Sequence, residues 1–551
     1  MNRSGPTEPW VVPASYAQER VWFAAQLVGD SPVYSVLDLI ELPPGVERDH
    51  VLAALRTVLE RQEQLRTAFR LEDGELRQAV HDATLALPVE DLDLTGLPAA
   101  EVERRTTAAL DAATVAIPLD TAPLWRAVLV RRGAGDLALL LVSSHAVVDG
   151  ESEPLLRAEL REACLAAAEG RAPDLPELPV QYADYAVWQR DRLAGGELDR
   201  LAAHWAGVLA GLPAVHGLPT DLPRPAERSF AGGEVRFALP DGAAAGIAAL
   251  ARSAAATPFT VLFAAWVALL RRLSGAEDVV VGVPVAGRDR PELAPLIGMF
   301  VNVLVVRVRL TGDPSFTELL AGCRRALLDA YDHQEMPFQV LVERLADRRD
   351  PAVPPLYQLA FNSVDAGFSH RPGSTEDDLM LEVARDEFRV EFNTALFTEA
   401  TATAVAEDYR RVLAAVLADP EQRLSALPVR ERLARPAAAA APPAAAPPAA
   451  AAYVAPRTAA EELVAEVWTD VLGRDRIGAL DDFFDLGGHS LLALRVIARL
   501  SAAAEIELPI QAFFADTTVA GVATAVESVL AAELDELTED EAERLVERSR
   551  G

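Results

Sequence analysis

Apolar residues follow two different patterns along the first 430 residues of the chain. Continuous apolar runs predict buried strands at 136–144 (DLALLLVSS), 278–285 (DVVVGVPV) and 302–310 (NVLVVRVRL). The stretch 51–69 (VLAALRTVLERQEQLRTAF) has helical periodicity over most of its length. This mixture predicts an α/β (α+β) fold for the region.

A segment of unusual composition follows this region. Every residue from Pro436 to Ala452 is alanine or proline. Such a segment offers nothing to bury, and its paired prolines block a helix and favour an extended polyproline conformation. At about 3.1 Å per residue it would span roughly 50 Å. We therefore predict a semi-rigid linker over 433–456.

The pattern after the linker is helical. An amphipathic helix is predicted in AAEELVAEVWTDVLG (459–473), a second from about Ser490, and a third over about 519–530. Residues 457–530 are thus expected to form a small all-α bundle. In the remaining stretch, 531–551, Thr538 precedes Glu541 by three residues, a capping-box spacing that predicts one more, acidic helix.

Composition narrows the possible partners. A length of 551 residues suggests two to four domains, and 83 acidic against 51 basic residues give a net charge of −32. This charge argues against a nucleic acid or an anionic membrane as partner. The two cysteines, Cys164 and Cys323, are too few for a disulfide framework, and we find neither a signal peptide nor a long apolar run. We expect a cytoplasmic monomer.

The most specific motif is DLGGHSL, 485–491. Gly487 and Gly488 allow a tight turn, and Ser490 begins a helix, where an attached phosphate would meet the positive end of the helix dipole. A serine that merely caps a helix is the alternative for an isolated motif of this kind. With its flanking residues, DLGGHSL resembles the attachment site of peptidyl carrier proteins from nonribosomal peptide synthetases. The resemblance implies 4'-phosphopantetheine on Ser490, and we assign no catalysis to His489.

A second motif, SSHAVVDG (143–150), follows a predicted strand. It resembles the His-His-x-x-x-Asp-Gly signature of condensation domains, with Ser144 in place of the first histidine. Other signatures of that family are matched in order by ASYAQERVW (14–22), RQEQLRTAF (61–69), YADYAVW (182–188), IGMFVN (297–302) and HQEMPFQ (333–339). The resemblance covers about 10–430. It implies two lobes related to chloramphenicol acetyltransferase, 10–180 and 181–432, meeting at a tunnel that holds His145.

The resemblance also suggests roles for individual residues. His145 is the candidate to take a proton from, or to position, an attacking amine, since a neutral imidazole suits that chemistry. Asp149 is expected to form a structural ion pair with Arg288 rather than to orient His145. Gly150 is expected to provide close backbone approach or an unusual dihedral angle, and its amide is a candidate to face the oxyanion. Ser144 is expected to be supporting architecture.

Other polar residues of the signatures are expected to be structural. Gln18, Arg20, Arg61 and Arg66 are interpreted as polar anchors, and His333 and Asn302 as structural residues. The remaining histidines show no metal-ligand spacing, so no metal is predicted, and no phosphate-binding loop indicates ATP use.

These observations predict a condensation–carrier didomain that forms an amide between a carrier-bound acyl donor and an amine. Because no adenylation domain lies between the two parts, a separate adenylating enzyme would load the carrier. The other expected partners are an upstream donor carrier protein and a phosphopantetheinyl transferase. Two alternatives stay open: ester formation onto a hydroxyl acceptor, and a non-catalytic platform that recruits partner enzymes to the carrier.

Overall fold

The computed structural model describes ten stretches of the chain: residues 8–29, 31–133, 135–240, 242–345, 352–364, 373–384, 387–430, 453–474, 476–488 and 490–536. They form two compact units. The first contains most of residues 1–439, and the second contains 440–551.

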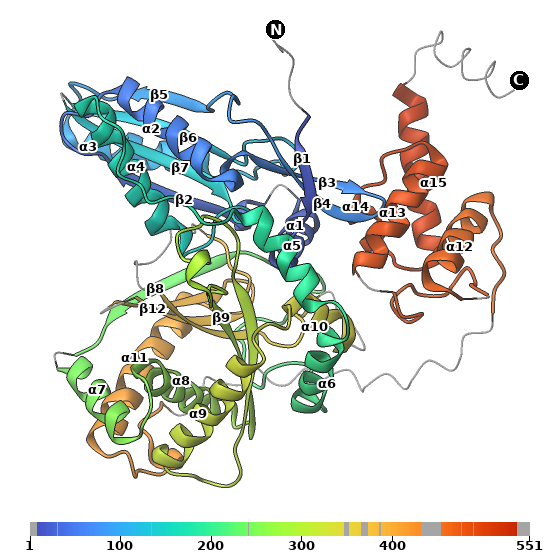
Figure 1. The fold of residues 1–551 in the computed structure, drawn as a ribbon. Helices are drawn as coiled ribbons and strands as arrows, with labels where there is room; N and C mark the ends of the chain where they lie inside the picture. Colours follow the sequence, from blue (N-terminus) through green and yellow to red (C-terminus); the bar gives the residue numbers. More distant parts are fainter. Residues whose placement is uncertain are drawn as a thin grey trace, which may run out of the picture. The chain divides into compact units, whose positions relative to one another are not determined.

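The N-terminal half of the first unit is built on a four-stranded sheet in the order β2-β7-β6-β5 (Figure 1). Its central strand β7 is buried almost throughout and runs antiparallel to both β2 and β6. Helices α2 and α4 pack against each other beside this sheet. The strands are β2 (Ser35–Glu41), β5 (Val89–Asp93), β6 (Trp125–Gly133) and β7 (Asp136–Ser144), and the helices are α2 (Arg48–Arg61), α3 (Ala99–Ala113) and α4 (Ser152–Glu169).

A smaller sheet has the order β1-β4-β3, and further helices connect the two halves of the region. Tyr182 and Tyr185 on α5 pack with Phe300 in a separate buried cluster. The elements are β1 (Trp10–Pro13), α1 (Tyr16–Val28), β3 (Thr67–Glu72), β4 (Glu75–Val80), α5 (Tyr182–Leu193) and α6 (Glu197–Leu209).

The C-terminal half of the first unit contains a six-stranded sheet in the order β10-β9-β11-β12-β13-β8. Helices α7, α8, α9 and α11 lie together with this sheet (Figure 1). The strands are β8 (Gly232–Ala238), β9 (Asp278–Val285), β10 (Asn302–Arg309), β11 (Leu359–Val364), β12 (Leu379–Ala384) and β13 (Glu387–Asn393). The helices are α7 (Ala243–Ser253), α8 (Pro258–Ser274), α9 (Phe316–Asp332), α10 (Phe338–Leu345) and α11 (Glu399–Ala418).

Helix α8 is the centre of the largest hydrophobic core. Its residues from Val261 to Leu270 are all buried, and Trp266 is completely enclosed. A helix that is apolar all round must be covered on every side, here by the sheet and by α7, α9 and α11. No single described helix is long and apolar enough to cross a membrane; α7 and α8 together meet that length and composition, but they are bent by 99°.

The sequence-based prediction of an α/β fold followed by helices is confirmed. The strands predicted at 136–144 and 278–285 are β7 and β9, and the third is β10, one residue shorter than expected. The helical stretch at 51–69 ends earlier than its periodicity suggested. Helix α2 stops at Arg61, a 3-10 turn spans Glu63–Arg66, and β3 begins at Thr67.

The carrier region is a bundle with a compact aromatic core. Trp468 on α12 lies 5.0 Å from Phe483 between ring centroids, and Phe513 lies 5.3 Å from Phe483. The three predicted helices are present as α12 (Ala459–Leu472), α13 (Ser490–Ala504) and α15 (Val519–Glu536). The short α14 (Ile510–Ala515), which buries Phe513, was not predicted. The alanine–proline segment 436–452 and the capping box of Thr538 and Glu541 lie outside the described residues.

The two glycines before Ser490 are required for different physical reasons. Gly487 has φ +93°, in the region that favours glycine. Gly488 has an ordinary φ, but a Cβ there would lie 2.4 Å from the ring of Phe483 and 2.5 Å from its carbonyl oxygen. The turn that leads into α13 therefore requires glycine at both positions.

We predict that Gly488→Ala destabilises the carrier bundle by about 1–3 kcal/mol, because a buried Phe483 and its backbone must move. Chemical denaturation followed by tryptophan fluorescence would measure the change. Asp485→Ala, an exposed side chain in the same loop, is the control and should change stability by less than about 0.5 kcal/mol. Equal stability of Gly488→Ala and the parent would contradict the close packing of this turn.

Candidate active site

The end of strand β7 fixes the position of His145. The backbone N–H of Ser144 donates to the carbonyl oxygen of Leu124 at 2.9 Å, and that of His145 donates to Tyr34 at 2.8 Å. These partners precede the two neighbouring strands, so the last residues of β7 are held from both sides. His145 is buried, with 9 % of its surface exposed.

The imidazole of His145 is oriented by its own turn. Its Nδ1 lies 2.8 Å from the carbonyl oxygen of Val148. A carbonyl oxygen can only accept, so Nδ1 carries the proton in this contact, and the lone pair of a neutral ring lies on Nε2. The turn therefore selects the tautomer in which Nε2 can accept a proton.

Ser144, which replaces the family's first histidine, faces the same turn. Its side chain is buried, and its Oγ accepts a hydrogen bond from the backbone N–H of Ala146 at 3.2 Å. Its carbonyl oxygen accepts from Val147 and Val148. The contacts of Ser144 are thus with the backbone that shapes the turn.

Asp149 is completely buried and lies in a bidentate pair with Arg288. Its Oδ2 is 2.8 Å from Nη1 of Arg288, and its Oδ1 is 3.0 Å from Nη2. Oδ2 also accepts from the backbone N–H of Phe300 at 2.9 Å, while Arg288 lies over the Phe300 ring at 4.2 Å. The pair joins the turn after β7 to the segment that follows β9.

Ser152, at the start of α4, completes this network. Its backbone N–H and its Oγ lie 2.9 and 2.7 Å from Oδ1 of Asp149. The same Oγ accepts from Arg288 Nη2 at 2.8 Å and from the backbone N–H of Gly298 at 3.0 Å. Sequence analysis did not identify Ser152, although its position three residues after Asp149 at a helix start is typical of a capping contact.

The backbone conformation and the surroundings of Gly150 can be compared with those predicted from the sequence. Its φ lies outside the left-handed region, and a Cβ there would meet no described atom within 4 Å. Gly150 therefore has neither a left-handed φ nor a packed neighbour among the described residues, while the close approach of a reacting group to its backbone stays a prediction. Gly150 is exposed in the turn that precedes α4, and no described backbone packs against it.

The other signature stretches are tied together by buried hydrogen bonds. The Oγ of Ser15 lies 2.8 Å from the hydroxyl of Tyr182, which donates to the carbonyl oxygen of Met299. Gln18 donates to Gln64 at 2.9 Å. Burial raises the pKa of Tyr182 well above its usual value, so its hydroxyl stays protonated as a donor. One network thus joins the stretches at 14–22, 61–69, 182–188 and 297–302.

The predicted anchors have specific partners. Arg61 forms a 2.8 Å ion pair with Glu159 on α4, and Arg66 donates to the carbonyl oxygen of His81. Asn302 donates to the carbonyl oxygens of Gln334 and Met336 at 2.9 and 2.7 Å and accepts from Phe338 at 3.0 Å, which fixes the loop of the last signature. Arg20 is half-buried, and its Nε makes no hydrogen bond with the described residues.

A pocket in the first unit lies beside this network. It is lined by Tyr16, Tyr185, Trp188, Phe300, Asn302 and Glu335, among others. Phe300 and Asn302 connect it directly to Asp149 and to the loop after α9. The pocket is therefore shaped by the same residues that hold the turn of His145.

The carrier motif provides a turn that fits an attached group. Ser490 is the first residue of α13, and its side chain and His489 lie outside what the structure describes. The glycine at 488 brings the turn onto Phe483, while Leu494 and Ile497 are buried in the bundle. This leaves Ser490 at a helix start, where backbone N–H groups and the helix dipole favour a phosphodiester.

Comparison with protein families and curated sequences agrees with these features. The model of the condensation domain matches residues 10–432, and that of the phosphopantetheine attachment site matches 462–526. Phosphinothricin tripeptide synthetase PhsC of Streptomyces viridochromogenes is 38% identical over 449 residues, which cover 78% of this chain and 41% of that protein. The dimodular nonribosomal peptide synthase of Bacillus subtilis is 36% identical over 450 residues, 76% of this chain and 19% of that protein. The chain thus spans less than half the length of these relatives.

Solved structures show the same fold. The X-domain from teicoplanin biosynthesis has a TM-score of 0.68 and 27% sequence identity, and the match covers 76% of this chain and 98% of that chain. The X-domain in its complex with OxyB gives the same TM-score and identity, over 78% of this chain and 99% of that chain. The chain belongs to the condensation domain family of nonribosomal peptide synthetases, and its condensation domain is followed by a carrier domain of the kind that bears covalently attached 4'-phosphopantetheine.

Proposed function

We propose that this chain transfers a carrier-bound acyl group to an amine and so forms an amide. The observation that carries the proposal is the turn at 145–149, in which His145 is held in one tautomer by Val148 while Asp149 is occupied by Arg288. An acid engaged in this way does not orient the imidazole, so His145 and Asp149 have separate tasks.

The chemistry requires a C–N bond to form as the C–S bond of a thioester breaks. Nε2 of His145 accepts the proton that the attacking amine loses, and that proton leaves with the thiol of the donor arm. The open space beside Gly150 allows the reacting carbonyl to approach the turn. The backbone N–H of Gly150 is our candidate donor to its oxygen as negative charge develops.

Ser490 is the proposed attachment site in the carrier. When bound there, 4'-phosphopantetheine supplies a flexible arm that presents an aminoacyl group as a thioester. The residues of this chain position the arm: Gly487 and Gly488 shape the turn, and the start of α13 faces the phosphate. The expected partners are a phosphopantetheinyl transferase and an upstream donor carrier.

The order of the matched regions supports our proposal that a separate adenylating enzyme loads the carrier. Only residues 433–461 lie between the condensation model and the attachment-site model, and much of this segment is alanine and proline. That length cannot hold a domain with its own core. The amino acid on Ser490 is therefore proposed to be activated in trans.

A platform that recruits other enzymes is the second candidate function. Two observations favour it: Ser144 replaces the first histidine of the motif, and the X-domain, which is 27% identical, is known in a complex with OxyB. His145 argues for catalysis instead, because a platform does not require an oriented imidazole. Transfer to a hydroxyl acceptor, which would give an ester, uses the same proton acceptor.

We predict that Ser490→Ala abolishes modification of the chain. Incubation with coenzyme A and a phosphopantetheinyl transferase should add one arm to the parent protein, as measured by intact-protein mass spectrometry. Ser528→Ala, an exposed helical serine of the same bundle, is the matched control and should be modified like the parent. A modified Ser490→Ala protein would refute the attachment site.

We predict that His145→Ala lowers the rate of condensation by about a hundredfold or more, because it removes the proton acceptor. Ser144→Ala should lower the rate by about tenfold at most, since its hydroxyl supports the turn through a hydrogen bond to Ala146. Single-turnover assays with loaded donor and acceptor would measure both. Unchanged turnover by a folded His145→Ala protein would favour the platform.

We predict that Asp149→Asn destabilises the first unit by roughly 3–5 kcal/mol, since it leaves the buried charge of Arg288 without its partner. Asp289→Asn removes an exposed charge from the neighbouring residue and serves as the control. The double variant Asp149→Asn/Arg288→Met should recover part of the loss. Thermal and chemical denaturation would measure the changes, and a stable but inactive Asp149→Asn protein would point to a direct catalytic role.

A further inference from the structure

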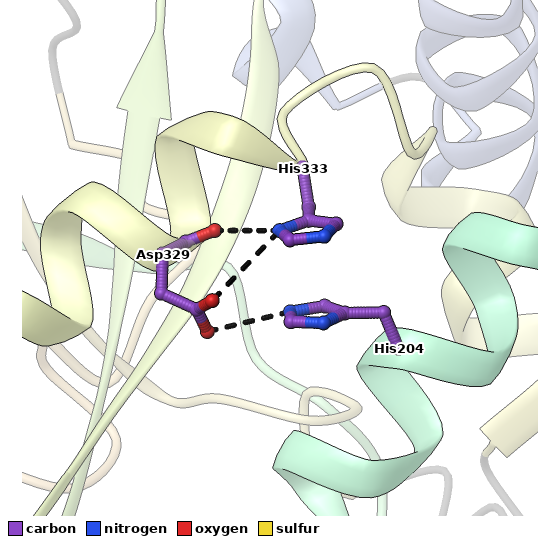
Figure 2. A group of neighbouring side chains, drawn as sticks. All are labelled: His204, Asp329 and His333. Carbon is purple, nitrogen blue, oxygen red and sulfur yellow. Dashed lines mark hydrogen bonds and ion pairs between the residues drawn. The ribbon is translucent and has the colours of Figure 1, made fainter.

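Two histidines and an aspartate, contributed by α6 and by the C-terminal end of α9, form a cluster in the first unit (Figure 2). His204 lies on α6, Asp329 lies in the last turn of α9, and His333 directly follows that helix. No metal was predicted from the sequence, because the chain shows no metal-ligand spacing between its histidines. The fold nevertheless brings His204 to Asp329 and His333, which lie more than a hundred positions further along the chain.

The two imidazole rings are stacked face to face. Their centroids are 3.4 Å apart, and their planes differ by 4°. The Nε2 atom of His204 lies 3.3 Å from Oδ2 of Asp329, and Nδ1 of His333 lies 3.9 Å from Oδ1. Figure 2 shows both nitrogens on the side of the rings that faces the carboxylate.

The nitrogen of His204 lacks a well-aligned donor or acceptor. Its Nε2 is buried and makes no hydrogen bond of good geometry with any described residue, although the carboxylate is close. The nearby Arg200 is already paired with Glu197 at 2.7 Å.

The backbone around the cluster is held firmly. Trp205, which is buried, donates from Nε1 to the carbonyl oxygen of His333 at 3.3 Å, so α6 and the end of α9 are tied together. His333 Nδ1 donates to the carbonyl oxygen of Asp329 at 2.8 Å. Coordination through this nitrogen would replace that hydrogen bond and release its proton to solvent.

We propose that His204, Asp329 and His333 bind a divalent transition-metal ion of the Zn²⁺ class. Two imidazole nitrogens and one carboxylate oxygen suit Zn²⁺, whereas Mg²⁺ and Ca²⁺ prefer oxygen ligands alone. The candidate ligand atoms lie within 4.8 Å of one another. Tetrahedral Zn²⁺ needs separations of about 3.4 Å at its usual bond lengths. Because an imidazole binds a metal close to its own ring plane, binding also requires the two stacked rings to rotate out of their parallel arrangement.

The ion would act as a cross-link between α6 and the end of α9. Three protein ligands leave a fourth position for water. His333 begins the loop whose carbonyl oxygens at Gln334 and Met336 accept from Asn302, and Glu335 of this loop lines the pocket beside the candidate active site. Bound metal would therefore hold one wall of that pocket.

The test uses the full chain without an affinity tag, first treated with a chelator. Isothermal titration with Zn²⁺ should show one saturable site per chain, and Zn²⁺ should raise the melting temperature of the first unit. Co²⁺ should give visible absorption bands from a site with nitrogen ligands. Because no carrier loading or condensation is involved, failure of this proposal is distinct from failure of the proposed function.

Variants assign the site to the three residues. His204→Gln, His333→Gln and Asp329→Asn should each weaken Zn²⁺ binding by about tenfold or more. Asp332→Asn, an exposed acid on the same helix, and His50→Gln are the controls and should bind like the parent. Asp329 is half exposed, so Asp329→Asn is expected to fold even if a histidine variant does not.

Two results would overturn the proposal. One is the absence of saturable Zn²⁺ binding by the parent chain. The other is binding by Asp329→Asn, and by whichever histidine variant folds, that stays within about threefold of the parent, since adventitious surface histidines would then account for the Zn²⁺ that the chain takes up.

Discussion

The buried pair of Asp149 and Arg288 is the contact on which the geometry of the candidate active site depends. It lies at the junction of the two halves of the first unit, with Ser152 and the backbone of Phe300 as further hydrogen-bond partners. Taking two charges out of water is costly, and the attraction between them does little more than offset that cost. The pair is therefore more important for the position of His145 than for the stability of the fold. Strand β7 holds the turn at His145, and Arg288 holds it at Asp149.

The signature stretches of the family are connected physically through this junction. Tyr182 on α5 contacts Ser15 and Met299, Gln62 contacts the backbone of Ile297, and Asn302 fixes the loop at Gln334. Most of these contacts use amides, hydroxyls and backbone groups rather than charges. Buried polar groups of this kind are costly unless every partner is present, which makes the arrangement specific as well as rigid. The same loop begins at His333, so the proposed metal site and the candidate active site share one structural support.

Local pattern predicted the regular elements better than their ends. The apolar runs at 136–144 and 278–285 became β7 and β9 with the expected bounds, because a strand buried on both faces must be apolar throughout. The helical period at 51–69 did not reveal the break after Arg61, where Gln62 turns inward to contact Glu159 and Pro295. The short α14 was missed because six residues are too few to show a helical period. For Gly150, the residue type suggested an unusual dihedral angle or close backbone approach, and the structure shows no left-handed φ there.

The sequence by itself determined the order of the two parts, strands β7, β9 and β10, the three main helices of the carrier, the place of His145 at the end of a strand and that of Ser490 at the start of a helix. These features depend on residues that are close in the chain, and their periodicity and turn chemistry are written locally. Only the tertiary structure decided which nitrogen of His145 holds the proton, that Ser152 shares the carboxylate of Asp149, and that His204 lies against His333. The first two are contacts over three residues, whose geometry depends on how neighbouring elements hold the turn after β7. The third joins residues that are far apart in the chain, and such a contact leaves no period or spacing in a single sequence.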